Sequence, residues 1–169
     1  MDTIIDFLWD WKWLIILIII GNQLKKLWNM YNGIQELLQG VNEAKSNIAV
    51  ILNQKVEIIN KFYAVVSQYD GYEKNIQLQV SGDYAQSAKE ASKAVAYIHG
   101  VAMAYPELKS DKNYKMFLDQ ITSNERALTE RREIFNNIVK SYNVYITKLP
   151  ICFLAKALGY TTKEYFESN

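Results

Sequence analysis

Few side chains in this sequence have the chemistry that catalysis needs. His99 is the single histidine and Cys152 the single cysteine among 169 residues. A Ser-His-Asp or Cys-His arrangement would have to use His99. A zinc site or a di-iron bundle centre needs more histidine or cysteine ligands than the chain contains. We therefore expect no catalytic residue, no metal site, no cofactor and no enzymatic activity.

Both residues have a structural interpretation. His99 lies beside a predicted core position, where a lone histidine is usually hydrogen-bonded. Cys152 lies between Ile151 and Phe153, which predicts a buried and unreactive thiol. A single cysteine also suits a reducing compartment, because it cannot form an intramolecular disulfide.

Charged residues that interrupt an apolar pattern are the next candidates. Lys45 and Lys55 fall on positions that are otherwise apolar, and an unpaired buried ammonium group is costly. Each must therefore reach solvent or meet an acidic partner. We favour a polar layer that sets the helix register, or simply the open end of the bundle at a turn, over a layer that contacts a ligand or partner. Asn124 and Arg131, in the last long helix, are open to the same two interpretations. Glu125 and Arg132, seven residues apart, are predicted to pair with a neighbouring helix and fix its position.

These residues lie on a heptad pattern that begins at Leu24. The two apolar series are Leu24, Tyr31, Leu38, Lys45, Leu52, Ile59, Val66 and Leu27, Ile34, Val41, Ile48, Lys55, Phe62, Tyr69. A seven-residue period is typical of helices packed as in a coiled coil and excludes a strand. The polar stretch Asn53-Gln54-Lys55 is the predicted turn that folds this region into a hairpin.

Two more long helices follow in the sequence. One is predicted over 83–105, with Asp83 as N-cap and Gln86 as its capping-box partner, and Pro106 ends it. The other is predicted over 111–148. Four long helices with short links predict an all-α fold, a left-handed, heptad-packed, up-and-down antiparallel four-helix bundle.

A proline closes the last long helix and begins the tail. Pro150 stops the helix, and residues 151–166 are predicted to dock as a tail with one helical turn. Gly159 is the predicted cap of that turn.

The first 21 residues are predicted to form an N-terminal membrane helix. The uninterrupted apolar core, 13–20, is shorter than the about 20 residues of a membrane span, and Asp6, Asp10 and Lys12 interrupt the longer stretch. Clustered tryptophans are typical of the membrane interface. The predicted anchor residues are Trp9, Trp11, Trp13, Leu14, Ile15, Ile16, Leu17, Ile18, Ile19 and Ile20. Two alternatives remain open, a helix lying in the membrane plane and an apolar helix buried in a soluble bundle.

Charge distribution bears on orientation and partners. Lys25 and Lys26 follow the apolar stretch, so the positive-inside rule places the bundle in the cytoplasm and the N-terminus outside, although Lys12 opposes this. The 19 basic and 18 acidic residues are mixed along the chain, which argues against nucleic acid. The expected partners are the lipid membrane and another protein, or a second copy bound through the helices.

Several separated motifs resemble the LemA family. The resemblance begins in LKKLWNMYNGIQELLQGVNEAKSNIAVILNQ, continues through AYPELKSDKNY, and ends in GYTTKEYFE. The polar positions that match the family are Tyr31, Asn32, Glu43, Glu125, Arg132, Asn136, Tyr142 and Asn143. One departure is Asn60, which stands where the family usually has a proline.

The resemblance implies a fold and a membrane rather than a mechanism. Members are expected to have one N-terminal membrane helix, a short external N-terminus and a helical bundle of no established activity. The predicted organisation is an anchor helix at 1–21, a LemA-like bundle at 22–150 and a docking tail at 151–169. We expect a non-enzymatic scaffold or recruitment factor in a bacterial cell membrane, and the alternative is a ligand-sensing or regulatory bundle.

Overall fold

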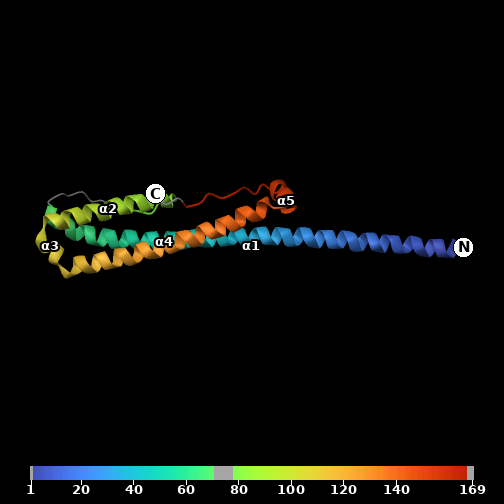
Figure 1. Cartoon of the computed structure of the whole chain (residues 1–169), viewed down its shortest axis with the longest axis horizontal. Coiled ribbons are helices and arrows are strands. Elements are labelled where there is room, and N and C mark those ends of the chain that lie inside the picture. Colours follow the sequence, from blue (N-terminus) through green and yellow to red (C-terminus); the bar gives the residue numbers. More distant parts are fainter. Residues whose placement is uncertain (1, 71–77, 167–169) are drawn as a thin grey trace. The chain divides into compact units, whose positions relative to one another are not determined.

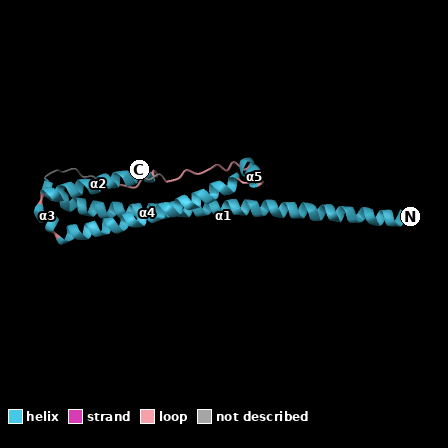
Figure 2. Ribbon diagram, viewed as in Figure 1, coloured by secondary structure: helices cyan, strands magenta, loops and turns pink. Residues whose placement is uncertain are grey.

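The chain is all-helical in the part that the structure describes. The structure is a computed structural model that describes the backbone of residues 2–70 and 78–166 and the side chains of residues 11–67 and 78–166. Its helices, shown in Figures 1 and 2, are α1 (Asp2–Asp70), α2 (Tyr84–Ala104), α3 (Pro106–Ser110), α4 (Lys112–Thr147) and α5 (Ile151–Ala157). The predicted all-α class is confirmed.

The helix α1 runs without a break through the predicted turn. Asn53, Gln54 and Lys55 are all helical, so the predicted hairpin is wrong. No glycine or proline lies between Val41 and Asp70, so nothing in this stretch interrupts the backbone hydrogen bonds. The described residues accordingly hold three long helices rather than the predicted four.

The helices α1 and α2 run in the same direction, not in opposite directions. Lys45 lies over the Tyr84 ring, and further along both helices the Tyr63 ring stacks on the Tyr97 ring. Contacts that advance together along both helices require a parallel pair. The end of α1 and the start of α2 therefore lie at opposite ends of this helix pair. The predicted up-and-down antiparallel order is wrong here, because two helices joined by a tight turn would run in opposite directions and α1 and α2 do not.

The start and end of α2 follow the sequence signals closely. The Asp83 side chain accepts a hydrogen bond from the Gln86 amide at 3.0 Å, which confirms the N-cap. The Gln86 side chain instead donates to Glu90, so the capping box is only half formed. Tyr105 leaves the helical conformation, and Pro106 then begins the short helix α3.

The helices α4 and α5 also match their predicted positions. Asp111 accepts a hydrogen bond from the Asn113 amide at 2.6 Å immediately before α4. After α5, Gly159 has a φ of 77°, and the Tyr160 amide donates to the Ala155 carbonyl at 2.9 Å. This is the Schellman arrangement, in which glycine takes the left-handed conformation at low cost. The predicted Gly159 cap is confirmed.

The chain divides into two compact units. One contains residues 1–40 and 140–163, and the other contains residues 41–139 and 164–169. The second unit holds the large core, in which α1, α2 and α4 pack together. The Phe62 ring stacks on the Phe117 ring with centroids 4.4 Å apart, and Ala91, Ile98 and Leu108 are almost fully buried in the same cluster.

Candidate functional site

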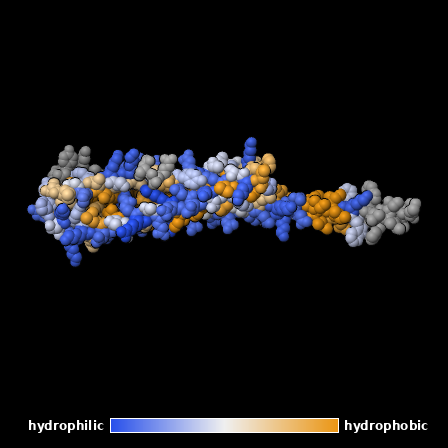
Figure 3. Space-filling model, viewed as in Figure 1, coloured by the Kyte–Doolittle hydropathy of each residue, from blue (hydrophilic) through white to orange (hydrophobic). Residues whose placement is uncertain are grey.

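The first candidate surface is the apolar stretch of α1 at residues 11–20. All ten residues are exposed, and the apolar ones keep between 43% (Ile16) and 63% (Ile18) of their surface open. Figure 3 shows this stretch as a block of hydrophobic residues with hydrophilic residues on its C-terminal side. A helix that is apolar on every face normally lies inside protein or lipid. The described chain covers none of its faces.

The predicted anchor residues are therefore brought together by α1, with one exception. Trp11, Trp13 and residues 14–20 follow each other on one helix. Trp9 lies outside the described side chains, as do Asp6 and Asp10. No helix in the described part of the chain combines the length and the hydropathy that crossing a membrane requires.

The second candidate is a polar layer in the unit of residues 41–139. Lys55 on α1 is fully buried, and its Nζ atom lies 2.5 Å from Oε1 of Glu125 on α4. The same Nζ atom also donates to the Ser92 hydroxyl on α2 at 3.2 Å. One ammonium group thus connects all three long helices, which confirms that Lys55 meets an acidic partner.

The other interrupting polar residues lie in less critical places. Lys45 is exposed and lies over the Tyr84 ring, 5.5 Å from its centroid, so it reaches solvent as predicted. Asn124, next to the polar layer, is buried and donates to the Ile51 carbonyl at 3.3 Å. Its own carbonyl oxygen is buried without a hydrogen-bond partner among the described residues. Arg131 is exposed.

The third feature is a set of asparagines that hold extended chain segments against helices. Asn136 on α4 donates to the Phe166 carbonyl at 3.1 Å and accepts from the Phe166 amide at 2.7 Å. An asparagine side chain has the same donor and acceptor as a peptide group, so it can replace a neighbouring strand. We call each such pair an asparagine clamp.

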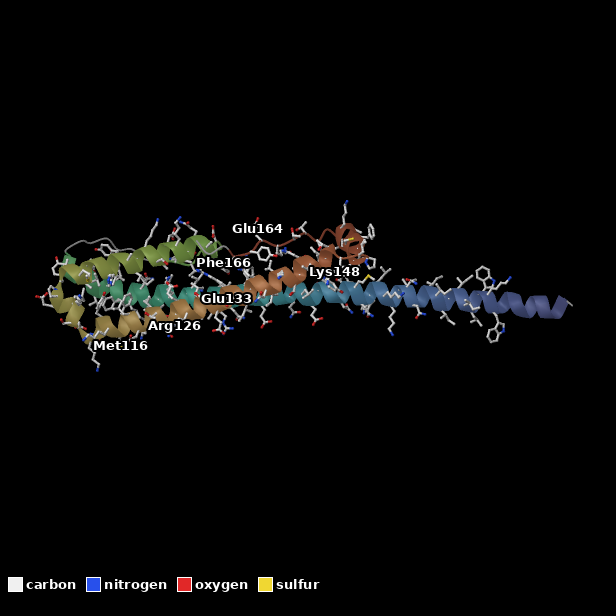
Figure 4. The ribbon with its side chains drawn as sticks, in the orientation of Figure 1. Met116, Arg126, Glu133, Lys148, Glu164 and Phe166 are labelled. Atoms are coloured by element: carbon white, nitrogen blue, oxygen red, sulfur yellow. The ribbon has the colours of Figure 1, made fainter. Side chains whose placement is uncertain are left out.

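Arg132 completes the binding of Phe166. Its guanidinium carbon lies 4.6 Å above the centre of the Phe166 ring, and Figure 4 shows Phe166 at the end of the described tail. Burial lowers the pKa of Arg132, and the Glu125 carboxylate partly offsets that shift. The Arg132 Nε atom is buried without a hydrogen-bond partner in the described ranges. The prediction that Arg132 pairs with a neighbouring helix is therefore wrong, because this side chain covers the tail.

A second clamp lies in the unit of residues 1–40 and 140–163. Asn143 donates to the Lys163 carbonyl and accepts from the Lys163 amide, both at 2.8 Å. Beside it, the Tyr142 hydroxyl donates to the Thr161 carbonyl at 3.2 Å. The Tyr142 side chain is fully buried, and this burial raises its pKa, with a smaller contribution from Tyr160.

The other end of this tail segment contacts α1. Gln35 donates a hydrogen bond through its side-chain amide to the Tyr160 hydroxyl. Polar bonds to its backbone and to one hydroxyl thus hold this segment of the tail.

A third clamp was not predicted from the sequence. Asn60 on α1 donates to the Leu78 carbonyl at 3.1 Å and accepts from the Leu78 amide at 3.2 Å. This shows what the side chain does at the position where the family usually has a proline: it holds Leu78, in the described residues just before α2. One signal for the tail clamps is present in the sequence. Asn136 and Asn143 are two helical turns apart, about 10.5 Å, and three extended residues cover about 10 Å.

The remaining candidate residues do not come together in a common site among the described residues. Tyr31, Asn32 and Glu43, all family-matching positions, are exposed on α1. The His99 Nδ1 atom lies 2.7 Å from the Tyr114 hydroxyl, the hydrogen-bonded role expected for it. Cys152 is half-buried, less than predicted. No group of three or more His, Cys, Asp or Glu side chains that would suit a metal ion occurs in the described ranges.

The unit of residues 41–139 also has an open groove between α1 and α4. Its volume is about 570 Å³. Apolar side chains such as Phe62 and Phe117 line it together with the amides of Gln54, Gln120 and Asn113. The volume lies within the range of small-molecule sites, roughly 300–1,000 Å³.

These features define a class of protein, an all-helical bundle whose polar residues hold helices and connecting segments together. The chain belongs to the LemA family, whose model matches residues 44–169. This matched range includes the polar layer and all three asparagine clamps.

Curated relatives are more distant and much longer. The chain is 32% identical over 76 residues to magnetosome protein MamQ 2 of Paramagnetospirillum magneticum strain AMB-1, which is 45% of this chain and 28% of that protein. It is 33% identical over 76 residues to magnetosome protein MamQ of Magnetospirillum gryphiswaldense strain MSR-1, with the same coverage. The chain thus matches less than a third of the length of these relatives.

Proposed function

We propose that this protein is a non-enzymatic, membrane-anchored helical bundle that scaffolds or recruits other proteins. The exposed apolar stretch of α1, residues 11–20, is the observation that carries this proposal. The same helix continues into the packed core, where Lys55 and Leu52 are fully buried. One continuous helix would therefore link the membrane and the bundle.

The physical argument is the cost of hydrating this stretch. Each Leu or Ile side chain that moves from water to an apolar environment gains roughly 1.5–3 kcal/mol when fully buried. Seven such residues in succession, 14–20, would contribute far more than the about 1–2 kcal/mol needed to bias a binding equilibrium tenfold. Trp11 and Trp13 at one end suit the membrane interface, where an apolar ring and a polar N–H are both satisfied.

The form of the attachment is part of the proposal. We propose a single-pass anchor in the cell membrane with the N-terminus outside and the bundle in the cytoplasm, the orientation that Lys25 and Lys26 favour. A helix lying in the membrane plane would leave both ends of α1 on one side. Protease treatment of intact protoplasts distinguishes the two orientations of the bundle, because an external bundle would be degraded and a cytoplasmic one protected.

The scaffolding role is supported by the contacts that the polar residues make. Lys55 binds Glu125 and Ser92, and the asparagines hold extended segments, so these side chains stabilise the bundle itself. The relatives are named as magnetosome proteins, and we propose that this chain likewise acts together with other proteins.

Attachment can be tested with a matched pair of substitutions on α1. Ile16→Lys puts a charge into the exposed apolar stretch, whereas Val50→Lys puts the same charge at a similarly exposed position of the other unit. A lysine at the centre of a membrane segment costs roughly 2.5–3.5 kcal/mol, about 100-fold in partitioning. We expect Ile16→Lys to move the protein from the membrane fraction to the soluble fraction and Val50→Lys to have no effect. Equal distribution of both variants would contradict membrane attachment.

Recruitment requires a separate measurement. Chemical crosslinking in native membranes, followed by mass spectrometry, should recover the same partner or a second copy of the chain in repeated preparations. The control is the Ile16→Lys variant expressed at the same level. If only random neighbours are recovered, the scaffold proposal fails, and membrane attachment can still hold.

A second candidate function rests on the groove between α1 and α4. Its size and its mixed amide and apolar lining suit a small organic ligand, which would make the protein a sensing bundle. Binding would raise the melting temperature, because a ligand that binds only the folded state stabilises it. Met116→Trp should fill the groove and abolish the shift, whereas Met103→Trp, on an exposed part of α2 away from the groove, should not. No shift with any metabolite class would leave scaffolding as the function.

A further inference from the structure

Helix α5 exposes its larger apolar side chains instead of burying them. Phe153 keeps 70% of its surface exposed, and Leu149, just before the helix, keeps 74%. Leu158 at its end is also exposed, while Ala155 is the buried residue of the helix. Exposed aromatic and aliphatic side chains that lie this close together mark an interaction surface.

The charges around these apolar residues have one sign. Residues 148–158 read KLPICFLAKAL and contain Lys148 and Lys156 but no carboxylate. Figure 4 shows Lys148 where α4 ends, beside α5. Residues 21–31 of α1 read GNQLKKLWNMY and contain Lys25 and Lys26, again with no carboxylate. Apolar side chains with lysines and no acidic residues are the composition of segments that bind anionic lipid surfaces.

Both segments belong to the same unit and contact each other. Phe153, Pro150 and Leu154 line a groove of about 400 Å³ together with Gln23, Lys26, Leu27 and Met30 of α1. Leu24 and Leu27 of α1, predicted to be covered by a partner helix, are exposed here, as is Trp28. Helix α5 therefore lies against α1 directly after its apolar stretch. We call Leu149 and Phe153, with Lys148 and Lys156, the α5 surface.

The position along α1 matches the thickness of a membrane interface. Lys26 is six residues beyond Ile20, about 9 Å at the rise of an α-helix. A bilayer has a hydrocarbon core of about 30 Å within a total of about 40–45 Å, so each headgroup layer is roughly 5–8 Å thick. With Ile20 at the edge of the hydrocarbon, the groove and α5 lie level with the headgroups or just beyond them.

We propose that the α5 surface is a second membrane-contacting element, in which Leu149 and Phe153 enter the headgroup layer and Lys148 and Lys156 bind anionic lipid. The proposal rests on the proposed membrane attachment of α1. It adds to that function the class of lipid that is bound and a second membrane contact, far from the N-terminus in sequence. The C-terminal end of α4 would then be held at the membrane by two elements instead of one.

Site-specific fluorescence in the full-length protein tests this contact. The background is Cys152→Ser, so that each new cysteine carries the only label. An environment-sensitive dye is attached at Leu17→Cys in the anchor, at Leu149→Cys or Phe153→Cys in the α5 surface, and at Met116→Cys as an exposed control in the other unit. The proteins are reconstituted into vesicles of phosphatidylcholine with or without phosphatidylglycerol, and a lipid with a shallow nitroxide serves as quencher. Circular dichroism confirms that each labelled variant is helical.

The expected result is quenching and a blue shift at Leu17, Leu149 and Phe153, with neither at Met116. Omitting phosphatidylglycerol should reduce quenching at the α5 positions and leave Leu17 unchanged. Lys148→Gln and Lys156→Gln should each lower the ratio of docked to undocked α5 by about fivefold, since a lysine at an anionic surface contributes about 1 kcal/mol.

Three outcomes would overturn the inference, and they are distinguishable. Quenching at Leu17 without quenching at Leu149 or Phe153 would refute the α5 contact and leave membrane attachment intact. No quenching at any position would refute both. Quenching at the α5 positions that does not depend on phosphatidylglycerol or on the two lysines would refute anionic lipid as the partner.

Discussion

Replacing Glu125 with glutamine should destabilise the bundle more than replacing its buried partner, Lys55, with methionine. Lys55 is fully buried, and its Nζ atom has two partners, Glu125 Oε1 at 2.5 Å and the Ser92 hydroxyl at 3.2 Å. Glu125→Gln keeps the shape of the side chain and removes its charge. The ammonium group then stays buried with only neutral acceptors, which costs free energy.

The expected magnitude follows from the exposure of the two partners. Breaking a fully buried ion pair by removing one partner costs roughly 3–5 kcal/mol. The Glu125 side chain keeps 43% of its surface exposed, so solvent already screens part of the attraction. We therefore expect Glu125→Gln to lower the free energy of unfolding by about 2–3 kcal/mol. Lys55→Met removes the charge that needs compensation and should change stability by less than about 1 kcal/mol.

Thermal unfolding in a mild detergent, followed by circular dichroism, measures the difference. For a chain of this size about 1 kcal/mol corresponds to a shift of roughly 2–4 °C, so Glu125→Gln should lower the melting temperature by roughly 4–12 °C. The double variant Lys55→Met with Glu125→Gln should melt near the wild-type temperature, because no buried charge is left unpaired. Lys61→Met, whose partner Glu57 is exposed, is the control and should have little effect.

The reasoning would be refuted by either of two results. If Lys55→Met destabilises the protein as much as Glu125→Gln, the pair itself contributes net stability and desolvation of Lys55 is not the dominant cost. If Glu125→Gln melts within experimental error of the wild type, Lys55 does not depend on this carboxylate when the protein is folded.

Four further predictions concern single positions. Gly100→Ala should stabilise the protein by about 0.5–1 kcal/mol, because an added methyl there meets open space within α2. Gly33→Ala should instead destabilise it despite the same gain in helix propensity, since its Cβ would lie 2.7 Å from Cζ of Tyr145; thermal unfolding measures both. Asn143→Asp removes the side-chain N–H from its clamp, should cost about 1 kcal/mol and should speed amide hydrogen exchange in the tail. Burial raises the pKa of Tyr114, so the stability it contributes is present below about pH 10 and lost as pH rises through its folded pKa. Tyr114→Phe should flatten the loss of stability measured between about pH 9 and 11.

Each of these has a control in the same chain. Tyr165→Phe, at an exposed position, should leave the alkaline loss of stability as steep as in the wild type. Asn47→Asp, on an exposed part of α1, should not change exchange in the tail. If Gly33→Ala and Gly100→Ala shift the melting temperature equally, the close approach of Tyr145 to α1 is not present in solution.

Most of the helical content of the protein was predictable from the sequence. The start of α2 at Asp83, its end before Pro106 and the cap at Gly159 follow from local rules, because caps and helix ends depend on residues within one turn. The heptad pattern likewise identified the buried face of α1 from Ile34 onward, since burial on a helix follows its period. The exposure of Leu24 and Leu27 was not predictable, because the pattern does not say where partner helices end.

The chain topology required the tertiary structure. A polar stretch such as Asn53-Gln54-Lys55 is compatible with a turn or with a helix that meets a polar partner, and Glu125 decided between them from 70 residues away. The chain before α2 is held in place by Asn60 of α1, which binds Leu78 from 18 residues away. Such contacts link residues far apart in sequence, and local propensity does not encode them.

The candidate surfaces, too, were predictable from the sequence only in part. By itself the sequence determined that residues 11–20 are apolar, that the chain is helical, and that it resembles the LemA family, because these properties depend on composition and short-range spacing. Only the tertiary structure decided that Lys55 is paired, that Asn136 and Asn143 hold the tail, and that Phe153 is exposed beside Lys26 of α1. Each of these depends on which helix face meets another, and that choice is made when the apolar faces pack together.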